Sequence, residues 1–163
     1  DCVRVVRWMP DSEPPPTYAA AWPFKADIDR WQVVEFHPSH VRIWTGAMDV
    51  GADALDNPQR AGFHMRGFHG VTPETENSAH YFWTIATNPH PEMQDPTQLV
   101  IDQTAATFEE DKVVIEAQFR NQQRFGQRSV IDIHVDVGPN RARRVIDRLR
   151  QLTAQRQQAA QTL

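Results

Sequence analysis

Cysteine is nearly missing from this 163-residue chain, since Cys2 is the only one. A lone cysteine cannot form a disulfide within the chain, which agrees with a reducing, cytoplasmic location. No run of about 18 apolar residues occurs, so the sequence predicts no membrane-spanning helix. The opening residues, DCVR, lack the pattern of a signal peptide. Together these absences favour a cytoplasmic protein.

Lysine is also scarce. All but Lys25 and Lys112 of the 17 basic residues are Arg, and the formal net charge is −4. No basic block alternates with aromatic residues, so we expect no nucleic-acid partner.

The length is that of one domain, and 40% hydrophobic residues suffice for one core. Because the chain starts on a strand-like run without Met, we expect residues 1–163 to be one domain of a longer polypeptide.

Hydrophobic periodicity predicts an α+β fold. Two helices are expected. The first begins at Asp95 as N-cap, with Pro96 and Gln98 in favourable positions, and runs to about residue 122. The second follows Gly138-Pro139-Asn140 and runs to about Leu152. Proline-rich residues 11–17 and loop-like residues 48–60 are expected to be connections. Strands are expected at residues 2–8, 31–36, 40–47, 61–71, 79–87 and 129–137.

One carboxylate in the first expected helix, that of Asp111, falls on a helix face that is otherwise mainly apolar. At 100° per residue, Asp111 falls among the apolar residues Val100, Phe108, Val114 and Ile115. A carboxylate on an apolar face is costly unless it is hydrogen-bonded, paired or bound to a metal. The pattern alone leaves three interpretations open: a hydrogen-bonded aspartate at the helix edge, a metal or catalytic residue, or an error in the helical phase.

The opposite helix face reads as solvated. It carries opposite charges at i,i+3 and i,i+4 spacings, contributed by Glu109, Lys112, Glu116 and Arg120. We therefore expect the carboxylate of Asp111 to face an internal cavity near the sheet, unpaired by Lys or Arg.

Two segments resemble a known family. Residues 108–118, FEEDKVVIEAQ, resemble the E-D-K-x-V-x-E-A helix of Rieske non-haem iron oxygenases of the vanillate O-demethylase and dicamba monooxygenase type. Residues 67–83, GFHGVTPETENSAHYFW, resemble the H-x-x-T-P-E-T-E…S-x-H-Y-F-W strand–turn–strand of that family. The residues from Arg141 to Ile146 also suit its last helix. The resemblance is strong from about Gly62 to Gln118 and weak before it.

The resemblance implies a helix-grip, START-like catalytic domain: a curved antiparallel sheet packed by a long helix and a C-terminal helix. In the family the matching aspartate is the carboxylate of a 2-His-1-carboxylate Fe(II) site, which leaves positions open on the metal. It falls on Asp111. The resemblance also implies a [2Fe-2S] Rieske cluster in an N-terminal domain that this chain lacks. One cysteine cannot build that cluster.

The same resemblance implies an enzyme that acts on an aromatic substrate with dioxygen, through O-demethylation, N-demethylation or ring hydroxylation. Electrons are expected from NAD(P)H through a separate reductase or ferredoxin, and the assembly is expected to be a homotrimer. Two other classes stay open: a non-enzymatic START-like domain that binds a small molecule, and an oligomerising scaffold domain.

Histidine 69 is the main candidate for substrate contact. In dicamba-type members the matching histidine contacts the acid group of the substrate, whereas the plainer interpretation of His69 is a structural histidine at a strand end. Thr104, Thr107 and Phe82 are expected to line the cavity.

His64 and His69 have the H-x4-H spacing of the two histidine ligands of the family. We reject this pair, because five residues apart in a strand places them on opposite faces, and Ala61 stands where the motif has an acidic residue. The two histidine ligands are therefore expected outside the chain. The Arg-rich stretch from Arg141 to Arg150 is expected to be a solvated helix face, with docking of an acidic partner or a neighbouring subunit as the alternative.

Overall fold

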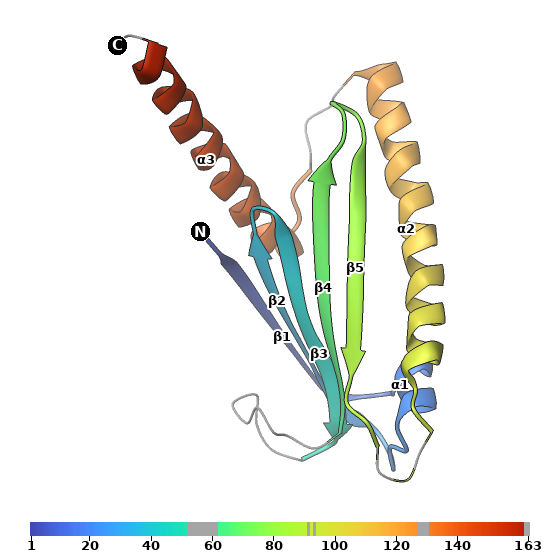
Figure 1. Cartoon of the computed structure of the whole chain (residues 1–163). Helices are drawn as coiled ribbons and strands as arrows, with labels where there is room; N and C mark the ends of the chain where they lie inside the picture. Colours follow the sequence, from blue (N-terminus) through green and yellow to red (C-terminus); the bar gives the residue numbers. More distant parts are fainter. Residues whose placement is uncertain (52–61, 91, 93, 127–130, 162–163) are drawn as a thin grey trace.

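The computed structural model describes residues 1–51, 62–90, 92, 94–126 and 131–161 (Figure 1). Five strands form one antiparallel sheet in the order β1-β2-β3-β4-β5. The α+β class is therefore confirmed, with a long helix and a C-terminal helix beside the sheet. The strands are β1 (Val3–Ser12), β2 (Ile28–His37), β3 (His40–Asp49), β4 (Phe63–Pro73) and β5 (Ala79–Thr87). The helices are α1 (Pro16–Ala21), α2 (Thr97–Phe125), the 3₁₀ turn η1 (His134–Asp136) and α3 (Val137–Gln161).

The expected turns set the register of the sheet. Pro38 and Ser39 form a two-residue loop, so that His37 pairs with His40. The side chains that lie directly opposite one another across the five strands share a face. The row Val5, Val34, Ile43, Gly67 and Ile85 lies on one face, and the row Val6, Val33, Trp44, Arg66 and Ala86 lies on the other.

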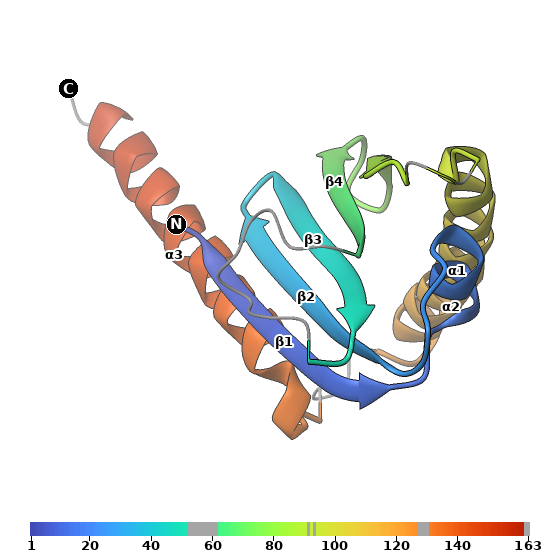
Figure 2. The ribbon, with the colours of Figure 1, turned by 90° about the horizontal axis from the view of Figure 1, so that it is seen from below.

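All three α-helices pack toward the first of these faces. The Oη atom of Tyr18 in α1 lies 2.8 Å from Thr45 Oγ1, and Phe108 of α2 contacts the ring of His69. A Cβ atom at Gly138 of α3 would lie 2.7 Å from Val5 Cγ2, so this glycine allows α3 to approach β1 closely. The two long helices thus lie at opposite edges of the sheet, α2 beside β5 and α3 beside β1 (Figures 1 and 2).

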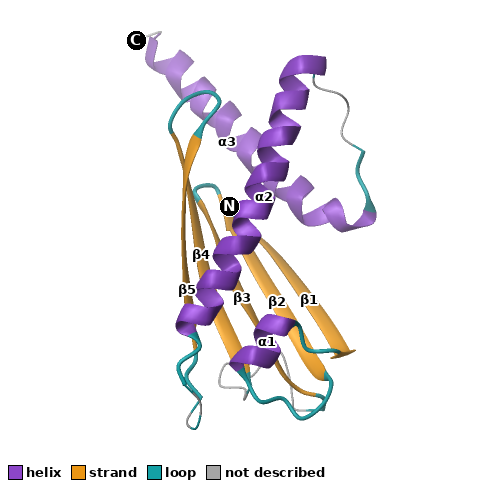
Figure 3. Cartoon of the chain, turned by 90° about the vertical axis from the view of Figure 1, so that its right-hand side faces the viewer, coloured by secondary structure: helices purple, strands orange, loops and turns teal. Residues whose placement is uncertain are grey.

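The main core lies where α1 meets the beginning of α2 (Figure 3). The side chains of Phe63, Val100 and Ile28 are fully buried there. The rings of Tyr18 and Phe63 pack edge to face with their centroids 5.3 Å apart. This cluster fixes the N-terminal turn of α2 on the sheet, and the rest of α2 runs along β5 from that point.

Asp29 of β2 connects the end of β1 with the residues just after β3 through hydrogen bonds to its carboxylate. Its carboxylate is buried and accepts backbone hydrogen bonds from Asp11 at 3.0 Å and from Gly51 at 3.1 Å. Asp11 has a φ of 48°, and the pairing of β1 with β2 shifts between Met9 and Ser12. The buried carboxylate therefore stabilises this irregularity, since it satisfies the Asp11 amide there, and it also satisfies the Gly51 amide just after β3.

Two expectations about secondary structure were wrong. Residues 11–17 were expected to be a connection, but β1 extends to Ser12 and α1 begins at Pro16. The strand expected at residues 129–137 does not form in its described part, because η1 and the start of α3 occupy it. There the Asp136 carboxylate accepts a hydrogen bond from the Ile133 amide at 2.9 Å, which closes a helical turn. Most of the loop expected at residues 48–60, with Ala61, Ser129 and Val130, lies outside the described residues.

The first long helix begins one residue later than expected. Pro96 takes the cap position, and α2 starts at Thr97. The carboxylate of Asp95 still serves this helix end, because it accepts hydrogen bonds from the Thr97 amide at 2.9 Å and hydroxyl at 2.6 Å. The Arg side chains of α3 are exposed, as expected for a solvated face. Arg148 forms an ion pair with Asp1. Within the described part of the chain, no helix is long and apolar enough to cross a bilayer.

Gly46 is required by a close contact on the face opposite α2. Trp31 is fully buried, and a Cβ atom at Gly46 would overlap its ring and the carbonyl oxygen of Phe63. We expect Gly46→Ala to lower the free energy of unfolding by about 1–3 kcal/mol, because the core would have to shift. Urea denaturation measures this loss. Gly70→Ala is the matched control: its Cβ would lie 3.3 Å from the exposed Phe68 ring, which can move. Equal losses in both variants would contradict the role of Gly46.

Candidate functional site

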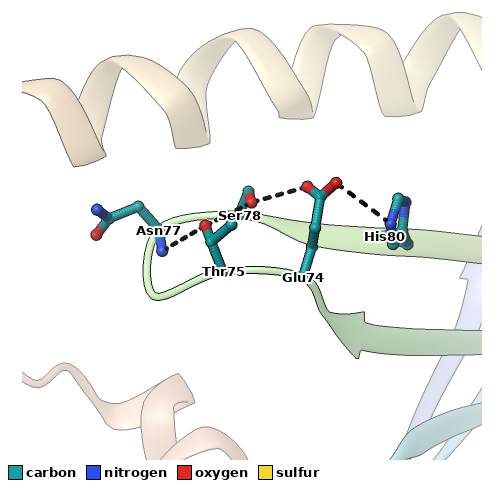
Figure 4. Close-up of polar contacts among 5 residues, drawn as sticks. All are labelled: Glu74, Thr75, Asn77, Ser78 and His80. Carbon is teal, nitrogen blue, oxygen red and sulfur yellow. Dashed lines mark hydrogen bonds and ion pairs between the residues drawn. The ribbon is translucent and has the colours of Figure 1, made fainter.

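The tight turn between β4 and β5 fixes the register of the site (Figure 4). The backbone amides of Glu74 and Thr75 donate to the Ser78 carbonyl at 3.0 and 3.2 Å. The Ser78 hydroxyl donates to the Glu74 carboxylate at 2.8 Å, and the same carboxylate lies 3.6 Å from His80 Nε2. Asn77 donates its amide to Thr75 Oγ1 at 3.2 Å. This turn holds β4 and β5 in the register that pairs His69 with Trp83.

The side chain of His69 faces α2, and its position depends on Tyr81 and Gly67. Its Nδ1 atom lies 2.6 Å from Tyr81 Oη. Gly67, two residues earlier in β4, leaves room for the imidazole: a Cβ atom there would lie 2.9 Å from Nε2. In the described part of the chain we find no hydrogen-bond partner for Nε2. The ring is therefore oriented through one nitrogen, and its other nitrogen stays available.

Phe108 of α2 closes this group of aromatic side chains. Its ring centroid lies 5.6 Å from that of His69, 5.8 Å from Tyr81 and 5.1 Å from Trp83, each in edge-to-face geometry. The four rings form an aromatic cluster, composed of His69, Tyr81, Trp83 and Phe108. Such rings offer apolar faces to a flat ligand, and the imidazole offers it a polar edge.

Burial and charge set the protonation of the cluster. Burial lowers the pKa of His69 from its ordinary value of 6.5, which favours the neutral imidazole. Burial raises the pKa of Tyr81, and the negative charge of Asp111 raises that pKa further. Tyr81 is therefore protonated at neutral pH and can donate its hydroxyl proton to His69 Nδ1. That hydrogen bond favours the tautomer with the ring proton on Nε2.

Asp111 lies one helical turn beyond Phe108 in α2, and its negative charge raises the pKa of Tyr81. The two basic residues nearby are engaged elsewhere: Lys112 pairs with Glu109 at 3.1 Å, and Arg120 pairs with Glu116 at 3.7 Å. Among the described residues no ion pair involves Asp111. That Asp111 lacks a Lys or Arg partner stays a prediction.

The expectation that Asp111 faces an enclosed cavity was wrong for the described chain. Asp111 is exposed. The apolar residues that follow it in α2 are also open to solvent, with exposed fractions of 67% for Val114 and 62% for Ile115. The carboxylate thus borders an open space beside the aromatic cluster.

Of the three other residues predicted to line the cavity, two lie on α2 and the third lies on the other face of the sheet. Thr104 is half-buried on α2, one turn before Phe108 and one turn after buried Val100. Thr107 is exposed, and its hydroxyl donates to the Gln103 carbonyl at 3.0 Å. Phe82 does not join the site, because strand alternation turns it away from Tyr81 and Trp83 to the other face of the sheet. Its ring lies 6.2 Å from that of His80 there.

His64 lies on the face opposite His69, as the strand argument required. Trp44 Nε1 donates to His64 Nδ1 at 3.4 Å, and the buried Trp31 ring packs edge to face against His64. Throughout residues 1–51, 62–90, 92, 94–126 and 131–161, no group of three or more His, Cys, Asp or Glu side chains could hold a metal ion. The register thus separates His64 from His69, and the placement of the two histidine ligands outside the chain stays a prediction.

Sequence analysis missed three members of the cluster, Tyr81, Trp83 and Phe108. The signal for Tyr81 was available, since it stands two residues before Trp83 and so shares its face. Phe108 was assigned to the apolar face of the helix, but its contact with His69 depends on how α2 lies along β5.

A family profile and several known proteins are similar to this chain. The profile of the vanillate O-demethylase oxygenase C-terminal domain matches residues 1–152. A vanillate O-demethylase oxygenase subunit of Pseudomonas sp. (strain HR199 / DSM 7063) is 34% identical over 157 residues, which are 91% of this chain and 44% of that protein.

Two further relatives cover different shares of the chain. A toluene-4-sulfonate monooxygenase system iron-sulfur subunit of Comamonas testosteroni is 28% identical over 90% of this chain and 43% of its own. The dicamba O-demethylase oxygenase component of Stenotrophomonas maltophilia is 43% identical over 63 residues, 37% of this chain and 18% of its own. This chain thus spans less than half the length of these relatives. No solved structure matches it significantly.

The lowered pKa of His69 predicts how stability depends on pH. The unfolded chain takes up the His69 proton near pH 6.5, whereas the folded chain takes it up only at lower pH. The free energy of unfolding should therefore fall as the pH drops below about 6.5, and His69→Asn should remove that part of the fall. Urea denaturation of both proteins between about pH 7.5 and 5 measures the difference. Parallel pH profiles for the two proteins would contradict the pKa direction.

Proposed function

Because this chain belongs to the vanillate O-demethylase oxygenase C-terminal domain family, we propose that it forms the iron- and substrate-binding part of a Rieske-type monooxygenase that acts on an aromatic substrate. The printed names of the relatives support an oxygenase over a non-enzymatic carrier of the same fold class. The observation that carries the proposal is structural: a carboxylate on α2, that of Asp111, which has no ion pair among the described residues, borders an oriented histidine and three aromatic rings.

In this proposal Asp111 is the carboxylate ligand of the mononuclear Fe(II). Its oxygen donors suit Fe(II), and the missing cationic partner leaves them available. The described residues supply this ligand alone, so they do not complete an iron site. The two histidine ligands and the [2Fe-2S] Rieske cluster belong to polypeptide outside this chain. Iron, when bound, supplies the reductive activation of dioxygen, with electrons from NAD(P)H through a separate reductase or ferredoxin.

The chain's own contribution is to hold and orient the substrate. His69 donates its Nε2 proton to a carboxylate or phenolate oxygen of the substrate, and the Tyr81 hydroxyl keeps the imidazole in the tautomer that can do so. Trp83 and Phe108 pack against the aromatic ring, and Thr104, one turn from Phe108, lies within the same stretch of α2. Thr107 stays a weaker candidate because its hydroxyl is engaged by the helix.

The reaction that fits best is O-demethylation by hydroxylation of a methoxy carbon. The resulting hemiacetal collapses to a phenol and formaldehyde. N-demethylation and ring hydroxylation are compatible with the same residues. We further propose that the complete enzyme is a cytoplasmic homotrimer. A substrate acid group on His69 would hold the ring at a fixed distance from the Asp111 side of the site, which decides the carbon that is oxidised.

His69→Ala in the full oxygenase that carries this domain should raise the KM for vanillate by about 10- to 100-fold, because a charge-assisted hydrogen bond is lost. Its iron content should stay close to that of the wild type. Asp111→Asn should lose iron and turnover together. Steady-state kinetics and iron analysis of both variants separate the two roles. If His69→Ala emptied the iron site and Asp111→Asn left it filled, the roles would be reversed.

The isolated 163-residue chain should bind Fe(II) weakly and show no oxygenase activity, since it offers one carboxylate where three ligands are needed. Anaerobic titration with Fe(II), followed by calorimetry, measures this. Asp111→Asn is the control and should abolish the weak binding that remains. A single tight site in the wild-type chain would show that it contains a complete ligand set.

A further inference from the structure

The face of the sheet opposite the helices carries a groove that the proposed function does not use. It has a volume of about 520 Å³. One row of directly paired side chains crosses all five strands along it, and a second row runs beside the first. The first row is Arg4, Glu35, Arg42, Phe68 and Thr84, and the second is Val6, Val33, Trp44, Arg66 and Ala86.

Positive charge dominates this groove. Arg4, Arg42 and Arg66 face one carboxylate, that of Glu35, which gives a balance of three positive charges against one negative charge. Glu35 is shared: Arg42 lies 3.0 Å from one of its oxygens and Arg4 lies 3.8 Å from the other. The groove can therefore accept further carboxylates without removing this bridge.

Arg66 is the arginine best placed to bind a carboxylate. Its guanidinium lies 4.1 Å from the centroid of the Trp44 ring, so one flat face of the group is held against the indole. In the described part of the chain no ion pair engages Arg66. Stacking leaves the N–H edge of a guanidinium free for bidentate recognition of a carboxylate.

The surroundings of the groove have the composition of a protein interface. Large apolar side chains on this face stay exposed, with fractions of 43% for Phe68, 49% for Val6 and 61% for Phe82. The basic residues are all Arg and none is Lys. Aromatic residues and Arg are enriched at protein–protein interfaces, whereas Lys is depleted.

The length of the groove favours a polypeptide over a small ligand. Five strands at a spacing of about 4.8 Å span about 19 Å, the length of about six extended residues. A monocyclic acid would cover less than half of this distance. We propose that this face is a docking site for an acidic segment of a partner protein, whose carboxylates bind Arg42 and Arg66 and whose apolar residues cover Phe68 and Trp44.

The test uses the chain itself and a peptide of about eight residues in which pairs of Glu alternate with pairs of Leu, so that each side of the extended peptide carries both residue types; the same peptide with Lys in place of Glu is its counterpart. Calorimetry gives the affinity, and heteronuclear NMR locates the contact. The Glu peptide should bind, shift amides along both rows of the groove, and bind more weakly at high salt. Arg66→Gln should weaken binding by at least about tenfold. Arg144→Gln, the same change at an exposed position of α3, should leave it unaltered.

Several outcomes would overturn the proposal. Equal binding of the Lys peptide, or unchanged affinity in Arg66→Gln, would exclude recognition of carboxylates by this groove. Benzoate that binds as tightly as the peptide would assign the groove to small anions. Self-association in sedimentation that Arg66→Gln abolishes would assign it to a second copy of the chain. If Arg66→Gln fails to fold by circular dichroism, Arg42→Gln replaces it with the same expectations.

Discussion

The pairing of β4 with β5 decides which side chains share a face with α2. The hydrogen-bonded turn at residues 74–78 sets this register, and the register places His69 opposite Trp83, with Tyr81 two residues away. A shift of β5 by one residue would turn Tyr81 and Trp83 to the other face of the sheet, while the pairing of β4 with β3 would leave His69 in place. Phe108 would then lose these two partners, and Asp111 would border a different surface. The site thus rests on the geometry of one hairpin.

Strand alternation also separates two kinds of chemistry. The face toward α2 presents a neutral imidazole and aromatic rings beside one carboxylate. The other face presents Arg66 stacked on Trp44 and the shared bridge at Glu35. One sheet can carry a site for a small aromatic molecule on the first face and a basic groove on the second, because neighbouring residues of each strand point to opposite sides.

The sequence could predict features that depend on local patterns. The strands at residues 31–36, 40–47 and 79–87 have alternation and turn residues that agree with each other, and the structure contains them. Helix α1 was missed because its six residues depend on tertiary contacts, above all that of Tyr18 with Thr45. The strand expected at residues 129–137 failed because alternation there competes with the Asp136 hydrogen bond that starts a helical turn.

The candidate site shows the same difference between features that follow from local sequence patterns and features that depend on tertiary packing. Helical phase was enough to place Asp111 on the side of Phe108, and strand parity was enough to separate His64 from His69. Neither could show that Tyr81 binds His69 Nδ1, or that Asp111 is exposed in this chain. Both depend on the angle at which α2 crosses β5 and on what covers the second half of that helix. Its exposed residues Val114 and Ile115 indicate how little of that surface this chain itself covers.

The most direct test of the account is a crystal structure of the full-length protein with a bound aromatic acid and with anomalous data collected at the iron edge. The account predicts an iron peak at the Asp111 carboxylate and a substrate oxygen within hydrogen-bond distance of His69 Nε2. An iron peak at His69, or a substrate bound away from the cluster of His69, Tyr81, Trp83 and Phe108, would contradict it.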